Sequence, residues 1–417
     1  MSGLQVEVRK GSTAKLGRVE GDLGVAKGAK IVAANGKAVT VTGAAHFEGD
    51  AEVDCSLQCD SIVVDRGVLK VSGDLAATRG VDVAHTVRVS GAISAEAIEV
   101  GGKMDAGSVS CKGSVRVGGI VEVAKALEAD SVDVGGKIAV RGAVKLRDLS
   151  VGGMAEVGGG SIAGRATIGG IFESKAPLEF GEIRVYGKCG LPAGCKGKRI
   201  STGGKLFVGG DLSCEQVEVG GLAEVKGGLS SSKVTVNGKL NVLGSLSFTD
   251  ALEIFGMGEV RGETKGVDLR VGGRLKTNKA VLSGAAEVAG QVETAVGLKA
   301  QSILVGRGSR CTGPLVGGRV ELGSSEYVAA NWSKSWAGQM ASIRLVGRMT
   351  SVEDVYADEV VLGANTRCKR VFARNIQLGA GSILEQATYT GELRQGPHRV
   401  FITKPPEKVE SLPPFPL

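Results

Sequence analysis

This chain is poor in the residues on which most catalytic and metal sites depend. Only three histidines occur in 417 residues, no two cysteines are separated by just two residues, and aromatic residues make up 4%. Zinc sites draw on histidine and closely spaced cysteine pairs, and phosphate-binding loops need glycine motifs that are missing, so we expect no metal and no cofactor. No partner motif accompanies His46, His85 or His398. We therefore expect no catalytic residues and no enzymatic activity.

Long apolar runs and clustered charges are also missing. No 18 consecutive apolar residues occur, which predicts no transmembrane segment, and the first residues lack the apolar core of a signal peptide. The 51 basic and 44 acidic residues are spread along the chain, so we expect no nucleic-acid partner. Eight irregularly spaced cysteines predict reduced thiols in a cytoplasmic protein. Cys189 and Cys195 flank one short loop and form the pair to test for a bridge.

Glycine is abundant, and much of it belongs to one repeated motif. A valine or similar residue precedes a Gly-Gly pair, or its equivalent, at a constant step of 17 residues from Val83 to Val236. The step of 17 resumes from Ile254 to Leu322, and we expect the next positions at Val346, Leu362 and Leu378 after an insertion. A repeat of this period over most of a chain indicates a solenoid.

Each repeat contains three apolar–polar–apolar triplets. Val132–Val134, Ile138–Val140 and Val144–Leu146 are the triplets of one repeat. Alternation with a period of two indicates a short strand with one buried face, and the glycines between triplets predict the corners, because glycine turns sharply without steric cost. One such coil cannot bury its own inward side chains, so we expect successive coils to stack with their strands in parallel.

The sequence therefore predicts an all-β fold, a single long triangular parallel β-solenoid over residues 1–396, with about twenty coils of about 17 residues. At about 4.8 Å per coil its length would be about 95 Å. An excursion over residues 324–342 carries Trp332 and Trp336, whose spacing suits one face of a short helix. Residues 397–417 hold six of the nine prolines and are expected to leave the solenoid as an extended tail.

The ends of the solenoid are the first candidate for function. A solenoid shows unpaired strand edges and a slice of apolar core at each end, unless a helix or a polar repeat covers it. The chain begins with an alternating strand over residues 4–8, so we expect an uncapped end that another subunit extends.

Units such as VRVGGIVEV and VDVGGKIAV, followed by a proline-containing tail, resemble the bactofilins. The resemblance implies a right-handed triangular β-helix and a cytoskeletal scaffold, near the membrane, that polymerises end to end without nucleotide. A bactofilin core has about a third as many coils as this chain. Carried onto this sequence, the resemblance places the polymer interface on the apolar residues of the terminal strands: Leu4, Val6, Val8, Ile376, Leu378, Ile383, Leu384 and Phe401.

Other contacts and functions remain open at the level of sequence. Trp332 and Trp336 could form a ligand platform, a lateral bundling surface or a cap over the core. The tail residues Leu412, Phe415 and Leu417 could cap their own end or dock on a neighbouring subunit, and we favour docking. The leading expectation is a homopolymeric filament subunit, with peripheral membrane association possible. The alternatives are a monomeric scaffold in a larger complex and a carbohydrate-binding or lyase-like β-helix.

Overall fold

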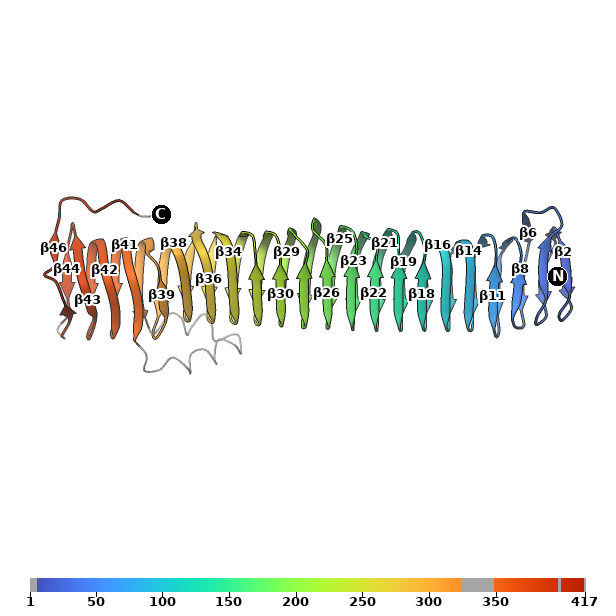
Figure 1. The fold of residues 1–417 in the computed structure, drawn as a ribbon, viewed down its shortest axis with the longest axis horizontal. Helices are drawn as coiled ribbons and strands as arrows, with labels where there is room; N and C mark the ends of the chain where they lie inside the picture. Colours follow the sequence, from blue (N-terminus) through green and yellow to red (C-terminus); the bar gives the residue numbers. More distant parts are fainter. Residues whose placement is uncertain (1–5, 325–348, 397–398, 416–417) are drawn as a thin grey trace. The chain divides into compact units, whose positions relative to one another are not determined.

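The computed structural model describes residues 6–324, 349–396 and 399–415. Within these ranges the chain is an all-β parallel solenoid of about 22 turns of about 17 residues, and no helix is present (Figure 1). The predicted β-solenoid is therefore confirmed. Accordingly, no helix in the described ranges is long and apolar enough to cross a membrane.

The chain divides into two compact units, residues 1–198 and 199–417, each of which is described by itself. The strands of unit 1 are β1 (Val6–Val8), β2 (Thr13–Leu16), β3 (Arg18–Val19), β4 (Leu23–Val25), β5 (Lys30–Ala33), β6 (Ala38–Val41), β7 (Ala44–Phe47), β8 (Ala51–Val53), β9 (Ser56–Cys59), β10 (Ser61–Val64), β11 (Val68–Val71), β12 (Leu75–Ala77), β13 (Gly80–Val83), β14 (Thr86–Ala95), β15 (Ala97–Val100), β16 (Lys103–Cys111), β17 (Ser114–Val117), β18 (Ile120–Val123), β19 (Leu127–Val134), β20 (Lys137–Val140), β21 (Val144–Val151), β22 (Met154–Val157), β23 (Gly160–Ile168), β24 (Ile171–Ser174), β25 (Leu178–Val185) and β26 (Lys188–Leu191).

The boundary between the units lies within β27 (Cys195–Thr202). The strands of unit 2 are β28 (Lys205–Val208), β29 (Leu212–Val219), β30 (Leu222–Val225), β31 (Leu229–Val236), β32 (Lys239–Val242), β33 (Leu246–Ile254), β34 (Met257–Gly266), β35 (Asp268–Val271), β36 (Arg274–Leu282), β37 (Ala285–Val288), β38 (Gln291–Gly306), β39 (Arg310–Thr312), β40 (Leu315–Ser324), β41 (Thr350–Leu362), β42 (Thr366–Leu378), β43 (Ile383–Tyr389), β44 (Leu393–Gln395), β45 (Phe401–Ile402) and β46 (Glu407–Lys408).

Three parallel ladders run through each unit. Ladder A holds the strands that precede the Gly-Gly corner, ladder B holds the strands that follow it, and ladder C holds the third strand of each turn. In ladder A of unit 1, Val100 pairs with Val83 on one side and with Val117 on the other. The repeated valine found in the sequence is therefore one column of residues in register, because the period of the sequence equals one turn.

The core lies between the three ladders and is built from the alternating side chains. In β17, Val115 and Val117 are 0% and 2% exposed, whereas Arg116 between them points outward to solvent. Most of the other core residues are valine, isoleucine, leucine and alanine, and burying such side chains is the main favourable term in folding. The polar residues of each triplet thereby form continuous columns on the outside of each ladder.

The Gly-Gly corners are glycine for a reason that differs from the one the sequence suggests. A Cβ on Gly135 would lie 2.3 Å from the carbonyl oxygen of Gly118, one turn earlier, and a Cβ on Gly136 would lie 2.6 Å from that of Gly119. The φ angles at these four glycines are not in the left-handed region. Close stacking of successive corners therefore excludes a side chain, and no unusual backbone angle is involved.

A second kind of corner is held by side-chain carboxylates. Asp74 Oδ1 accepts a 2.8 Å hydrogen bond from the backbone N–H of Ala92, in the next turn, and a Cβ on the neighbouring Gly91 would lie only 2.1 Å from that oxygen. The same arrangement recurs at both units. Its other carboxylate or amide acceptors are Asp22, Asp50, Asp148, Asp211, Asp268 and Asn375.

One position of the predicted repeat is wrong. Leu322 in β40 pairs directly with Leu362 in β41, so Val346 is not the intervening ladder position. The next described strand is β41, which begins at Thr350, and Val346 itself lies outside the described residues. So does the rest of residues 325–348, which include Trp332 and Trp336.

Candidate interaction surfaces

The first turn of unit 1 presents an apolar surface. Val6 pairs with Leu23, and the inward residues Ala14 and Leu16 of β2 pair with residues of β5. In the described part of the chain, β1 and β2 have a ladder partner on one side only. Val6, Ala14 and Leu16 are half-buried as a result, although they occupy core positions. Of the predicted interface residues here, Val8 is 5% exposed and Leu4 lies outside the described residues.

At the other end, the expected interface residues lie one turn inside the stack. Ile376 pairs with Val360 on one side and with Leu393 of β44 on the other, and it is 1% exposed. Leu378 and Leu384 are covered in the same way by β44 and β45, and they are 1% and 0% exposed. The chain supplies a further turn after residue 392, so these residues are core and do not form the terminal surface.

The last turn of unit 2 is polar at two of the core positions that are apolar in earlier turns, whereas Leu393 and Ile402 keep two others apolar. Gln395 occupies the ladder position of Leu378, and Lys408 occupies that of Tyr389. Pro405 and Pro406, between β45 and β46, have no N–H to donate to a further strand. Polar core positions and proline at an edge are devices by which proteins limit strand pairing at an open end.

Ile383 and Phe401, the other two residues predicted for the polymer interface at this end, lie on the outside of ladder B. Ile383 pairs with Phe401, which is 58% exposed. Phe401 and Ile402 form the short strand β45 beside β43, so the first part of the tail stays within the ladders as far as Lys408.

The tail then folds back along its own unit. The N–H of Val409 donates a 2.9 Å hydrogen bond to the carbonyl oxygen of Tyr389, and the ring of Phe415 meets Tyr356 edge-on at a centroid distance of 6.3 Å. Figure 1 shows this tail in dark red, running back from β46 over neighbouring strands. Leu412 is half-buried, Phe415 is 48% exposed, and Leu417 lies outside the described residues.

Phe415 contacts an aromatic strip that forms the outside of ladder C. The strip consists of the outward ladder positions of four successive turns, namely Val316, Tyr356, Phe372 and Thr388. Val316 and Thr388 are buried, at 2% and 6% exposed, so the half-buried rings of Tyr356 and Phe372 are its accessible part. The rings of Tyr356 and Phe372 stack at 4.8 Å with an interplanar angle of 14°. Burial raises the pKa of the Tyr356 phenol above its ordinary value. The signal in the sequence is a step of 16 residues between Tyr356 and Phe372, equal to the local turn length, which sequence reasoning missed.

The positively charged side chain of Arg370 lies beside the strip. The guanidinium of Arg370 lies 5.8 Å from the centroid of the Phe372 ring, and its Nε donates a 2.9 Å hydrogen bond to Asp354 Oδ1. The hydrogen bond and the charge of Asp354 raise the pKa of Arg370, which keeps the guanidinium charged. Cation–π contacts of this kind contribute about 0.5 to 1 kcal/mol at exposed sites.

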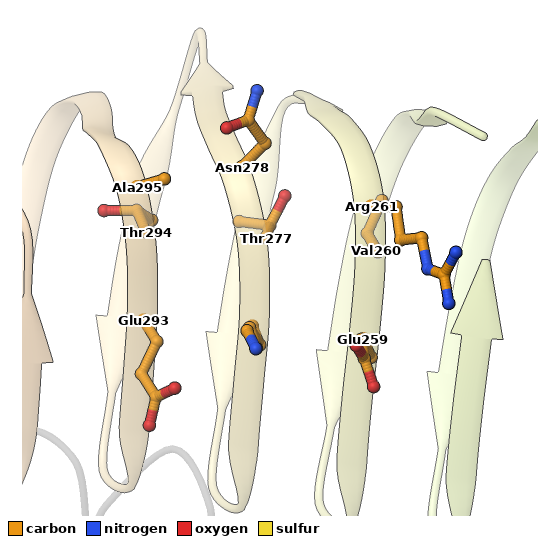
Figure 2. A pocket seen from close by; sticks show the side chains of 9 residues that line it. Glu259, Val260, Arg261, Thr277, Asn278, Glu293, Thr294 and Ala295 are labelled. Atoms are coloured by element: carbon orange, nitrogen blue, oxygen red, sulfur yellow. The ribbon is translucent and has the colours of Figure 1, made fainter. Parts of the chain in front are cut away.

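Two hollows lie on the outside of ladder B. In unit 2, a hollow of about 430 Å³ is lined by Glu259, Lys276 and Glu293 on successive turns. Figure 2 shows Glu259 and Glu293 on their strands. Thr277 lies nearer the corner in the same view, and its hydroxyl is 2.9 Å from the buried hydroxyl of Thr264. The charges alternate along the column, with Lys276 in register with Glu259 on one side and with Glu293 on the other.

The hollow in unit 1 has a volume of about 580 Å³ and includes Glu122, Ala139 and Glu156. Lys103 Nζ lies 2.7 Å from Glu122 Oε2, and the hydrogen bond from Lys103 holds the pKa of Glu122 below its ordinary value. Within the described ranges, no three His, Cys, Asp or Glu side chains are grouped so that they could hold a metal ion.

All eight cysteines are buried and free. Burial raises the pKa of Cys189 to about 12, and the backbone N–H of Leu178 lies 3.4 Å from the Sγ of Cys195 as a donor. Cys189 and Cys195 are therefore not bridged, and both belong to the core of unit 1.

Comparisons of the chain with family models, with curated proteins and with solved structures found no match.

Proposed function

We propose that this protein is a structural subunit that self-associates end to end into a nucleotide-independent filament and acts as a cytoplasmic scaffold of the bactofilin kind. The observation that carries the proposal is the first turn of unit 1, where Val6, Ala14 and Leu16 occupy core positions but remain half-buried. Free thiols on all eight cysteines support a reducing compartment.

The first turn favours a second copy as its partner. Fully burying a leucine or valine side chain contributes about 1.5 to 3 kcal/mol. Burying the exposed parts of Val6, Ala14 and Leu16 against a second copy would therefore favour association. Backbone groups along the free edges of β1 and β2 would also gain partners from a facing strand.

The two ends are unlike, and this favours a contact between two N-terminal turns. A head-to-tail contact would set the last turn, with Gln395 and Lys408 at its core positions, against the apolar first turn. Burying a charged or polar side chain without a partner costs several kcal/mol, so the apolar turn is better matched by another apolar turn. A filament then needs a different contact at its other end.

A monomeric scaffold in a larger complex is the second candidate, and the last turn of unit 2 favours it. Polar residues at core positions and two prolines at the edge are typical of a terminal repeat that ends in water.

Negative-stain electron microscopy of the full chain, without nucleotide and over a range of salt concentrations, tests the proposal. We expect filaments for the wild type and their loss for Leu16→Asp, because a carboxylate would be buried in the contact. Ile120→Asp is the matched control, since Ile120 is 39% exposed on the outside of ladder B, away from the first turn. Isolated particles for the wild type at every concentration would favour the monomeric scaffold.

A further inference from the structure

We infer that the aromatic strip on ladder C is a binding site for an extended proline-flanked segment, and that in the assembled protein the tail of a second copy occupies it. The inference rests on the proposed function, since it supplies the contact at the C-terminal end of the subunit.

The strip differs from the rest of its ladder. Outward positions on ladder C of the earlier turns in unit 2 are serine or lysine, with one valine: Ser213, Ser230, Ser247, Lys265, Val281 and Lys299. From Val316 onward, four successive turns carry no charge at this position, and two of them carry aromatic rings. Val316 and Thr388 are buried, so the accessible part of this run is the pair of half-buried rings of Tyr356 and Phe372. Accessible aromatic side chains are enriched at interaction sites.

The geometry of the strip suits a proline-rich ligand. The stacked rings of Tyr356 and Phe372 form a flat platform, and Arg370 is held beside it by Asp354. Extended proline-rich segments bind to surfaces of this kind, because proline rings pack on aromatic faces and the extended backbone loses little entropy on binding.

The chain itself contains a segment with this chemistry. The tail reads Leu412-Pro413-Pro414-Phe415, and Phe415 contacts Tyr356 within the same chain. The two prolines fix their φ angles near the extended conformation, which preorganises the segment. The contact shown with the strip is made by Phe415, and the two exposed prolines before it are expected to keep the segment extended as it reaches the rings.

The contact within one chain is small enough to exchange. Val409 makes the last backbone hydrogen bond of the tail in the described residues, and Phe415 remains 48% exposed on the strip. Five residues lie between Val409 and Phe415, and the six steps from one to the other can span about 20 Å, whereas Tyr356 lies two turns, about 10 Å, from Thr388. The segment is therefore longer than its own chain requires, and the proposed exchange uses this spare length to reach Tyr356 of another copy. Exchange of an identical segment between copies costs little energy and creates a symmetric dimer.

Three full-length variants test the exchange, all in the Leu16→Asp background so that the first turn does not contribute. Phe415→Ala removes the ligand but keeps the strip, and Tyr356→Thr removes the strip but keeps the ligand. Threonine is tolerated at this position of the ladder, as Thr388 occupies it two turns later. Phe401→Ala is the control, because Phe401 is an exposed aromatic residue of the last turn outside the strip.

Light scattering after size-exclusion chromatography gives the molar mass of each sample. We expect a concentration-dependent dimer for the background protein and for Phe401→Ala, monomers for Phe415→Ala and Tyr356→Thr alone, and a one-to-one complex when those two are mixed. A mixture that stays monomeric overturns the inference, as does a dimer that survives in both single variants.

A fluorescent peptide of residues 403–415 separates the two parts of the inference. The Phe415→Ala protein, whose strip is vacant, is expected to bind the peptide at least tenfold more tightly than a protein with its own tail seated, and Tyr356→Thr is expected not to bind. If the peptide binds but the mixed Phe415→Ala and Tyr356→Thr proteins form no complex, the tail binds the strip only within its own chain. Equal binding by all three proteins would overturn the site itself. Because these measurements do not use the first turn, they stand or fall separately from the filament.

Discussion

A side chain at a Gly-Gly corner tests why this repeat contains glycine. In Gly135→Ala the new Cβ would lie 2.3 Å from the carbonyl oxygen of Gly118, where a real contact needs at least 3.0 Å. The two turns would have to separate locally by about 0.7 Å, the difference between these distances. Because the corners stack directly on one another, neither turn can move aside without disturbing the next.

The cost follows from the hydrogen bonds at that corner. Gly135 N–H donates to Val117 O at 3.0 Å, and Gly136 N–H donates to Gly119 O at 3.1 Å. Lengthening both by about 0.7 Å would take them outside normal hydrogen-bonding distance. Each is worth about 0.5 to 1.5 kcal/mol, so we expect a loss of about 2 to 3 kcal/mol of local stability once overpacking is included.

Hydrogen exchange measured by mass spectrometry is the suitable assay, because a repeat protein opens locally and need not unfold in one step. A loss of about 2 to 3 kcal/mol corresponds to exchange about 30- to 150-fold faster in peptides that cover residues 115–155. The control is Gly80→Ala, whose Cβ would lie 3.6 Å from the carbonyl oxygen of Ala97 and should change exchange by less than about threefold. Equal protection in the two variants would refute the stacking argument.

Three further predictions concern other parts of the chain. Asp74→Ala leaves a backbone N–H of the next turn without its acceptor and should cost about 1 to 3 kcal/mol by local hydrogen exchange; unchanged protection would show that water replaces the carboxylate. The N–H of Gly313 and then Lys369 hold the pKa of Glu353 below 4.5 in the folded chain. Protection at Gly313 should therefore be full above about pH 4.5 and fall as the pH drops through that lowered pKa, and Glu353→Gln should remove this dependence. Finally, because burial raises the pKa of Cys59, Cys189 and Cys311 to about 12, a thiol reagent at about pH 8 should label the native protein slowly and the denatured protein at all eight cysteines; rapid labelling of native protein would contradict this burial.

The sequence by itself determined the ladders. A step of 17 residues between valines and alternation within triplets such as Val115–Val117 are sufficient to predict parallel strands, their register and their buried face, because both patterns are local and repeat with the turn. The choice of glycine at the corners could also be read, although its physical cause is the 2.3 Å approach of the previous turn.

Only the tertiary structure decided which residues end the stack. Ile376 and Leu378 look terminal in the sequence, yet β44 covers them, because a short strand such as Leu393–Gln395 carries too little alternation to be recognised. That Gln395 of the last turn occupies a core position becomes visible only when its ladder partner is known.

The aromatic strip and its ligand also required the structure. Phe415 and Tyr356 are far apart in the sequence and belong to no common repeat, so no periodicity links them. Their contact depends on the path that the tail takes after Val409, and that path is set by packing between distant segments. The repeated sequence determines how each turn stacks on the next, whereas contacts that skip turns are decided by the folded chain.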